Sequence, residues 1–126
     1  MSIVFVVGFG GFIGAVLRFT ISEYINRVIN STIPMGTLSV NILGSLLIGF
    51  LSLYFQHLNL STTLKRLLIT GLLGALTTFS TFSWETITLI ERGLFGKAIV
   101  NIALNLLLSI GATLLGMALF NRLNTI

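Results

Sequence analysis

Four long apolar runs, separated by short polar segments, dominate the pattern of this chain. The runs cover approximately residues 3–22, 35–55, 64–90 and 98–120. Each is long enough for a membrane-spanning helix, which needs about 20 mostly apolar residues. Pro34 marks the entry to the second run, and the turn Glu91-Arg92-Gly93 ends the third. The pattern predicts an all-α membrane protein whose four transmembrane helices form one domain, residues 1–126.

The composition supports this prediction. Of the 126 residues, 55% are hydrophobic and only 8% are charged, and the mean hydropathy is +1.06. A soluble domain of this size needs more charge to cover its surface. The net charge is +4, but the seven Lys and Arg residues are scattered, which indicates membrane flanks and no nucleic-acid partner. Because the chain has no cysteine, disulfides and thiol catalysis are excluded.

Positive charges are nearly balanced between the two ends of the predicted bundle. The side that holds both termini carries Lys65, Arg66 and Arg122. The opposite side carries Arg18, Arg27, Arg92 and Lys97. Membrane proteins are normally oriented by an excess of positive charge in short flanks. A chain without that excess can insert both ways, which favours an antiparallel dual-topology homodimer. A single orientation is the alternative.

Glycine and hydroxyl residues interrupt the middle of the third run. Gly71 and Gly74 precede residues 77–83, of which five carry hydroxyl groups. This combination is unfavourable for a continuous helix. A break here would free carbonyls near Gly74 to Thr77, and oxygen ligands suit a hard cation. The alternative is an intact helix whose hydroxyls bond to its own carbonyls.

Aromatic and polar residues add candidate pore chemistry. Phe79 and Phe82 are three residues apart and share one face of any helix after the break. They either pack against lipid or turn their positive ring edges towards an anion. Polar residues recur at four-residue spacing in the second and fourth runs: Thr37, Asn41 and Ser45, then Asn101, Asn105 and Ser109. Such stripes serve either interhelical hydrogen bonds or donors for a permeating anion.

The first run and the end of the hydroxyl-rich segment hold further candidates. Gly10 and Gly14 form a small-residue face that favours close helix packing. Arg18, one turn later, either extends towards the membrane surface or supplies positive potential at a pore mouth. Glu85 follows the hydroxyl-rich segment and is expected to be buried or paired.

Three segments together resemble the Fluc (CrcB) family of fluoride-selective ion channels: residues 10–18, 36–41 and 71–83. The resemblance extends over essentially the whole chain. It implies an antiparallel dimer with two pores, through which cytoplasmic fluoride leaves passively down its gradient. It also implies a multi-pass protein of the cell membrane, which is the inner membrane in a Gram-negative source.

The resemblance also implies roles for individual residues. The fluoride pore would include Thr37, Asn41, Phe79, Ser80, Phe82, Asn101, Asn105 and Ser109. Some relatives have tyrosine or serine at the positions of the fourth-helix asparagines. Arg18 would lie in the aqueous vestibule, and Glu85 would have a gating or supporting role. Backbone carbonyls of Gly74 and Thr77, from both subunits, would hold a central structural Na⁺.

Three other classes of protein are alternatives to a channel. A small multidrug-resistance-type proton-coupled transporter shares four short helices and balanced charge. It needs a carboxylate inside the first helix, whereas the first acid here, Glu23, lies beyond the apolar run. A non-conducting assembly subunit would explain the glycines but not the polar residues at mid-span. An enzyme is disfavoured, because His57 lies in a predicted loop without a catalytic set around it.

Overall fold

The computed structural model describes residues 2–125, and within them every regular element is a helix. The helical segments are α1 (Ile3–Val28), α2 (Met35–Leu58), α3 (Thr62–Lys65), η1 (Arg66–Leu73), α4 (Gly74–Leu76), α5 (Phe79–Glu91) and α6 (Phe95–Asn124). Four stretches are long and apolar enough to cross a membrane, the third being Thr62–Glu91 with its internal break. The prediction of four transmembrane helices with a broken third one is confirmed.

The helices extend past the apolar runs that predicted them. The largest difference is in α1, which continues to Val28 although its apolar run ends near residue 22. Hydrogen-bonded helix can continue through the polar headgroup region, because only the hydrocarbon core requires apolar side chains. The apolar pattern therefore locates the membrane core and underestimates the length of each helix.

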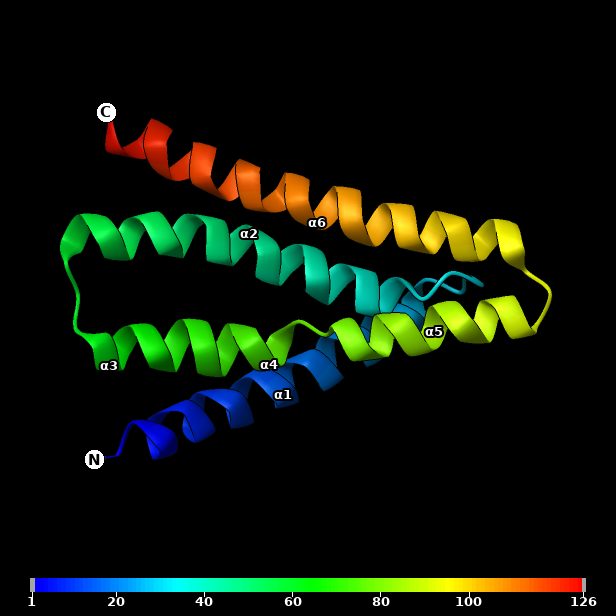
Figure 1. The fold of residues 1–126 in the computed structure, drawn as a ribbon, viewed down its shortest axis with the longest axis horizontal. Helices are drawn as coiled ribbons and strands as arrows, with labels where there is room; N and C mark the ends of the chain where they lie inside the picture. The colour runs from blue at the N-terminus through cyan, green and yellow to red at the C-terminus, as the bar shows by residue number, and fades with distance from the viewer. Residues whose placement is uncertain (1, 126) are drawn as a thin grey trace.

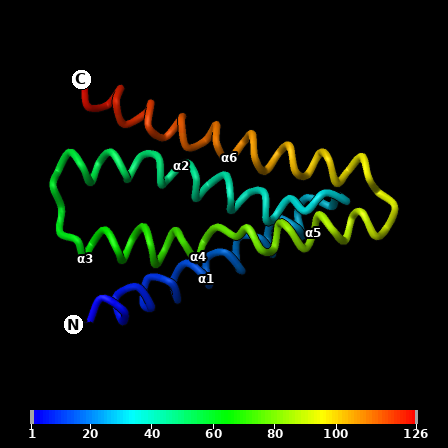
Figure 2. The backbone as a smooth tube through the Cα atoms, in the orientation of Figure 1, coloured from blue at the N-terminus to red at the C-terminus, as the bar shows by residue number. Residues whose placement is uncertain are grey.

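The four spans form an elongated bundle with both termini at one end (Figure 1). α2 lies between α6 and the broken third span, and α1 crosses the third span obliquely (Figures 1 and 2). α2 packs most extensively against α6, and α1 packs most extensively against η1. The loop between α2 and α3 lies at the end that holds the termini, and the α5–α6 turn lies at the opposite end.

Small residues allow the backbones of α1 and η1 to touch. A Cβ added to Gly10 would collide with the Leu67 carbonyl, and one added to Gly14 would collide with the Leu72 carbonyl. From the other side, a Cβ on Gly71 would lie 2.7 Å from the Val7 carbonyl oxygen. Close approach of this kind is typical of small-residue faces in membrane helices. The glycines of α1 thus fix the first half of the third span in place.

The structure adds a feature that the sequence pattern did not predict. Residues Arg66–Leu73 form a π-helix, whose hydrogen bonds join each N–H to the carbonyl five residues earlier. π-Helical turns are rare and often occur near functional sites. This one leads directly into α4 and the break.

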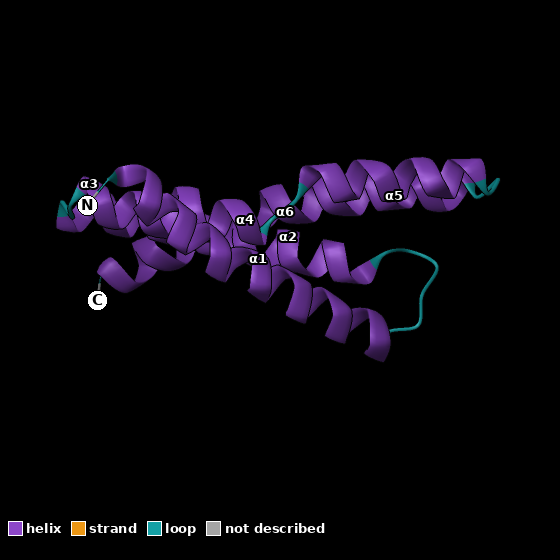
Figure 3. Cartoon of the chain, turned by 90° about the horizontal axis from the view of Figure 1, so that it is seen from below, coloured by secondary structure: helices purple, strands orange, loops and turns teal. Residues whose placement is uncertain are grey.

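The break itself consists of two extended residues. Thr77 has φ −88° and ψ 157°, and Thr78 has φ −151° and ψ 118°. Thr78 caps α5, because its side-chain oxygen accepts a hydrogen bond from the Thr81 N–H at 3.2 Å. Figure 3 shows the resulting non-helical link between α4 and α5. The break therefore lies at the C-terminal end of the predicted Gly74–Thr77 range.

Candidate functional site

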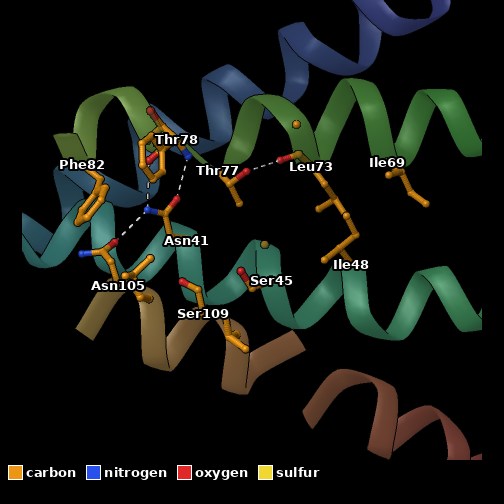
Figure 4. A pocket seen from close by; sticks show the side chains of 15 residues that line it. Asn41, Ser45, Ile48, Ile69, Leu73, Thr77, Thr78, Phe82, Asn105 and Ser109 are labelled. Atoms are coloured by element: carbon orange, nitrogen blue, oxygen red, sulfur yellow. Dashed lines mark hydrogen bonds between the residues drawn. The ribbon is translucent and has the colours of Figure 1, made fainter. Parts of the chain in front are cut away.

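A cleft of about 370 Å³ opens beside the break in the third span (Figure 4). It lies between α2, the two halves of the third span and α6. Its polar and aromatic lining comprises Asn41, Ser45, Thr77, Thr78, Phe79, Phe82, Asn105 and Ser109. Aliphatic residues and glycines complete it: Gly44, Ile48, Ile69, Leu73, Gly74, Leu106 and Ile110. The break thus faces the polar stripes of two neighbouring helices.

Asn41 pairs with the backbone of Thr78 at the break. Its Oδ1 accepts from the Thr78 N–H at 2.8 Å, and its Nδ2 donates to the Thr78 carbonyl at 3.2 Å. One side-chain amide therefore satisfies both backbone groups of a single extended residue. Unsatisfied backbone groups at membrane depth are costly, so this pair stabilises the break.

The same rearrangement frees carbonyls in the last turn before the break. In a continuous helix the Thr78 N–H would donate to the Gly74 carbonyl, and the Thr81 N–H to the Thr77 carbonyl. Here the Thr78 N–H donates to Asn41 instead, and the Thr81 N–H donates to the Thr78 hydroxyl at 3.2 Å. Gly74 and Thr77 thus each lose the N–H donor that a continuous helix would supply.

Arg18 donates a hydrogen bond to a third carbonyl of this turn. Its Nε donates to the Ala75 carbonyl oxygen at 2.9 Å, although the two residues are 57 positions apart in the chain. The half-buried guanidinium group therefore lies against the C-terminal end of α4. Cations are favourable at this end of a helix, because the carbonyl dipoles point towards it.

Phe79 and Phe82 line the cleft together, as their spacing suggested. Their rings meet edge to face, with centroids 5.3 Å apart and planes at 62°. Phe82 is 7% exposed, whereas Phe79 is 70% exposed. The edge of an aromatic ring carries partial positive charge, so ring edges at a cleft wall can attract an anion.

Hydroxyl groups supply further polar atoms in the cleft wall. Within residues 2–125, the Ser109 Oγ atom is buried and has no hydrogen-bond partner. Ser45, on α2, also lines the cleft, and Figure 4 shows the two side chains between α2 and α6. A buried hydroxyl without a partner costs about 1–3 kcal/mol, so Ser109 is a candidate donor to a bound ion or water.

Comparisons with known proteins show the family of the chain. Residues 5–117 match the family described as "CrcB-like protein, Camphor Resistance (CrcB)". The chain belongs to the CrcB family. It is 56% identical over 117 residues to the fluoride-specific ion channel FluC of a Sulfurovum species, covering 93% of this chain and 92% of the relative.

Two further relatives carry the same name. FluC of a Nitratiruptor species is 48% identical over 122 residues, which cover 97% of this chain and 94% of the relative. FluC of Shewanella frigidimarina is 48% identical over 123 residues, which cover 97% and 99%. The CrcB family is thus one of ion channels and not a class of enzymes, and this member is a multi-pass membrane protein.

Several of the residues expected in the CrcB pore lie outside the cleft. Asn101 is 1% exposed and lies behind the cleft wall, where its Nδ2 donates to the Thr86 hydroxyl at 3.0 Å. Thr37 is buried in α2, and Ser80 is exposed, with its hydroxyl 3.3 Å from that of Thr78. The structure thus brings together Asn41, Phe79, Phe82, Asn105 and Ser109, but not these three.

Glu85 lies near the middle of α5, outside the cleft lining. It lines a separate hollow of about 160 Å³ together with Thr32, Thr88 and Arg92. Within the described part of the chain its Oε1 atom is buried without a hydrogen-bond partner. Glu85 thus lies between the break and the α5–α6 end of the bundle. Its gating or supporting role stays a prediction.

Sequence reasoning gave no role to Thr78, although the residue is central to the site. It pairs with Asn41 and caps α5 at the same time. A threonine that begins a helix after a glycine-rich segment is a recognisable N-cap signal. Its pairing with Asn41 has no such signal, because 37 residues separate them.

Proposed function

We propose that this chain is a subunit of a fluoride-selective ion channel. The observation that carries the proposal is the broken third span, whose extended residues open into a cleft with aromatic edges and hydroxyls at mid-span. Membership of the CrcB family, and relatives named as fluoride-specific ion channels, support the identity of the ion.

The cleft chemistry suits a small, strongly hydrated anion. We assign ion contacts to the edges of Phe79 and Phe82 and to hydroxyl donors from Ser45 and Ser109. These groups replace part of the water shell of fluoride, and each is weak enough to release the ion. Asn105 lines the same wall, but its side-chain nitrogen donates to Asn101. Asn41 lines the same wall and holds the break open. Arg18 raises the positive potential beside it, which concentrates anions near the entrance.

An antiparallel second copy is part of the proposal. A broken backbone with exposed residues such as Gly74 cannot face lipid without cost, because lipid offers no hydrogen bonds. A second copy would cover the break, and a symmetric dimer would contain two such clefts and hence two pores. The near balance of Lys and Arg between the two ends is consistent with insertion in both orientations.

The freed carbonyls fit a structural Na⁺. Carbonyls in unwound membrane helices are established Na⁺ ligands. Gly74 and Thr77 have each lost their helical N–H donor, so their oxygens are free to serve this purpose. Each chain supplies two such carbonyls, and two chains would supply enough for one shared ion. The ion would offset the concentrated carbonyl charge where the two breaks meet.

We infer passive flow, because the residues that line the cleft include no carboxylate or histidine that could couple the ion to protons. Hydrogen fluoride is a weak acid that crosses membranes when the outside is acidic and ionises in the more neutral cytoplasm. A channel in the cell membrane, the inner membrane of a Gram-negative cell, then lets fluoride leave down its gradient and limits its toxicity.

Efflux from liposomes tests the proposal directly. Purified protein is reconstituted into liposomes loaded with KF, valinomycin is added, and external fluoride is recorded with an ion-selective electrode. KCl-loaded liposomes with a chloride electrode are the comparison. Fast fluoride efflux with little chloride efflux supports the channel. Folded protein that releases no fluoride would refute it, and fluoride movement that needs a proton gradient would favour a coupled transporter of the multidrug-resistance type.

A further inference from the structure

An unbroken row of hydrogen bonds runs from the helix break through three helices. The Thr78 N–H donates to Asn41 Oδ1 at 2.8 Å, and Asn41 Nδ2 donates to Asn105 Oδ1 at 3.0 Å. Asn105 Nδ2 donates to Asn101 Oδ1 at 3.1 Å. Beyond it, Asn101 Nδ2 donates to the Thr86 hydroxyl at 3.0 Å, and that hydroxyl donates to the Phe82 carbonyl at 2.8 Å.

The chemistry of the two ends gives the row a single direction. The backbone N–H of Thr78 can only donate, and the backbone carbonyl of Phe82 can only accept. Every side-chain amide between them must therefore turn its oxygen towards Thr78 and its nitrogen towards Thr86. Reversing the Asn41 or Asn105 amide would lose three bonds each. Reversing Asn101 would lose the bond from Asn105 and turn an acceptor towards the Thr86 hydroxyl.

Asn101 and Thr86 do not line the cleft, although the row ends at Phe82, which does. The two residues are 1% and 6% exposed. Asn41, by contrast, uses its Nδ2 for both the Thr78 carbonyl and Asn105. Its amide orientation sets which groups of the break face the cleft. The two backbone groups of Thr78 hold that orientation together with Asn105, which accepts a third bond from the same amide. Asn105 is held in turn by both the backbone carbonyl and the side-chain oxygen of Asn101.

We propose that Asn101 and Thr86 are positioning residues, which orient the Asn41 amide through Asn105 and so hold the break in its conducting shape. Polarised rows of hydrogen bonds in a low-dielectric interior are stronger than separate pairs, so a change at one end reaches the other. The proposal rests on the proposed channel function, but its first readout does not require transport.

The simplest rival explanation is that these residues only hold α5 against α6. In that case removing them would lower stability without reorienting Asn41. The two explanations differ in the side-chain NH₂ signal of Asn41 and the backbone N–H signal of Thr78. Both can be followed by ¹⁵N NMR of selectively labelled protein, and variants at Asn41 identify the first signal.

Thr86→Val is the main test variant, because it keeps the side-chain shape and removes the hydroxyl. Asn101→Leu is the second. Thr88→Val is the matched control. It makes the same change on the same helix, at a hydroxyl that, within residues 2–125, donates to the Trp84 carbonyl of its own helix and to no other group. We expect both test variants to move the Asn41 and Thr78 signals, and Thr88→Val to leave them in place.

Fluoride efflux in the liposome assay provides the second readout. We expect Thr86→Val and Asn101→Leu to slow efflux by about tenfold, the factor that corresponds to roughly one lost hydrogen bond. Thr88→Val should match the wild type. Unmoved signals in both folded test variants would overturn the proposal, as would an equal loss of efflux in the control. Absence of efflux from the wild type would instead refute the channel function. The NMR signals would still show whether Asn101 and Thr86 orient Asn41.

Discussion

At the scale of single residues, Ser109 combines a structural cost with a proposed function. Its buried Oγ has no partner within residues 2–125, and such a group destabilises a protein by about 1–3 kcal/mol. We expect Ser109→Ala to leave the unfolding temperature unchanged or higher. Because a donor to the anion is lost, we expect fluoride efflux to fall by roughly one to two orders of magnitude. Thermal unfolding and liposome efflux measure the two effects.

A control on the same helix separates the loss of a pore donor from a general effect. Thr113 lies one turn after Ser109, outside the cleft, and its hydroxyl donates to the Ser109 carbonyl at 3.2 Å. Thr113→Val should therefore conduct like the wild type. If Ser109→Ala also conducts normally, the hydroxyl has no part in the ion path.

The two phenylalanines should respond differently to the same replacement. Phe79 is 70% exposed in one chain and Phe82 is 7% exposed. We expect both Phe79→Ile and Phe82→Ile to slow efflux by about two- to tenfold, because an aliphatic side chain lacks the positive ring edge. Only Phe82→Ile should also lower the unfolding temperature, by part of the roughly 3–5 kcal/mol that Phe→Ala costs in a core. Unchanged efflux in both variants would contradict a ring-edge contact.

Spacing predicted these residues only in part. A three-residue interval correctly placed Phe79 and Phe82 on one face, because helix geometry is local. The four-residue interval likewise placed Asn101 and Asn105 on one face. It could not show that Asn101 lies against α5 while Ser109 faces the cleft. That difference depends on which other helix packs against each turn of α6. Residue patterns therefore predict a face, and tertiary packing decides its role.

At the scale of helices, α2 lies against the break where Gly44 faces Thr77, and we expect this contact to position the break. A Cβ added to Gly44 would collide with the Thr77 methyl group, while its other neighbours are at ordinary contact distances of 3.6 Å or more. We expect Gly44→Ala to destabilise the protein by about 1–3 kcal/mol, as overpacking typically does, and to slow efflux. Thermal unfolding and liposome efflux check both effects.

A second substitution should reverse this damage. Thr77→Ser removes the methyl group but keeps the hydroxyl, which donates to the Leu73 carbonyl at 3.1 Å. The Gly44→Ala/Thr77→Ser double variant should regain most of the lost stability and efflux. Gly8→Ala is the control, because nothing lies within 4 Å of its added carbon. A double variant no better than Gly44→Ala would show that this contact does not position the break.

The sequence predicted that the third span is broken, but not where or how. Two glycines and clustered hydroxyls weaken a helix locally, which is a property of nearby residues. The exact site depends on Asn41 and Gly44, which lie far away in the sequence, on another helix, and no local pattern contains them. The π-helix of η1 was missed for the same reason, since it packs against the glycine face of α1.

At the scale of the whole molecule, the proposed Na⁺ links the stability of the dimer to the salt present. If the freed carbonyls of Gly74 and Thr77 share one ion between two chains, the ion binds only the assembled state and stabilises it by mass action. Replacing Na⁺ with N-methyl-D-glucamine at constant ionic strength should lower the unfolding temperature and the dimer fraction in size-exclusion chromatography. Restoring Na⁺ should reverse both. Identical behaviour in the two cations would contradict a shared Na⁺ site.

The last prediction concerns dual topology. Because the chain has no cysteine, a single introduced cysteine can be labelled without background. Asn30 and Thr62 are exposed and lie near opposite ends of the bundle, before α2 and at the start of α3. Single variants Asn30→Cys and Thr62→Cys are treated in intact cells with a membrane-impermeant thiol reagent, and total thiols are counted after lysis. Because the flanking charges are nearly balanced, the reagent should label about half of the total thiols of each variant from outside.

A protein with one orientation would instead show nearly complete labelling at one position and almost none at the other. That result would exclude the antiparallel dimer, while leaving the cleft, the break and the hydrogen-bond row of a single chain unchanged.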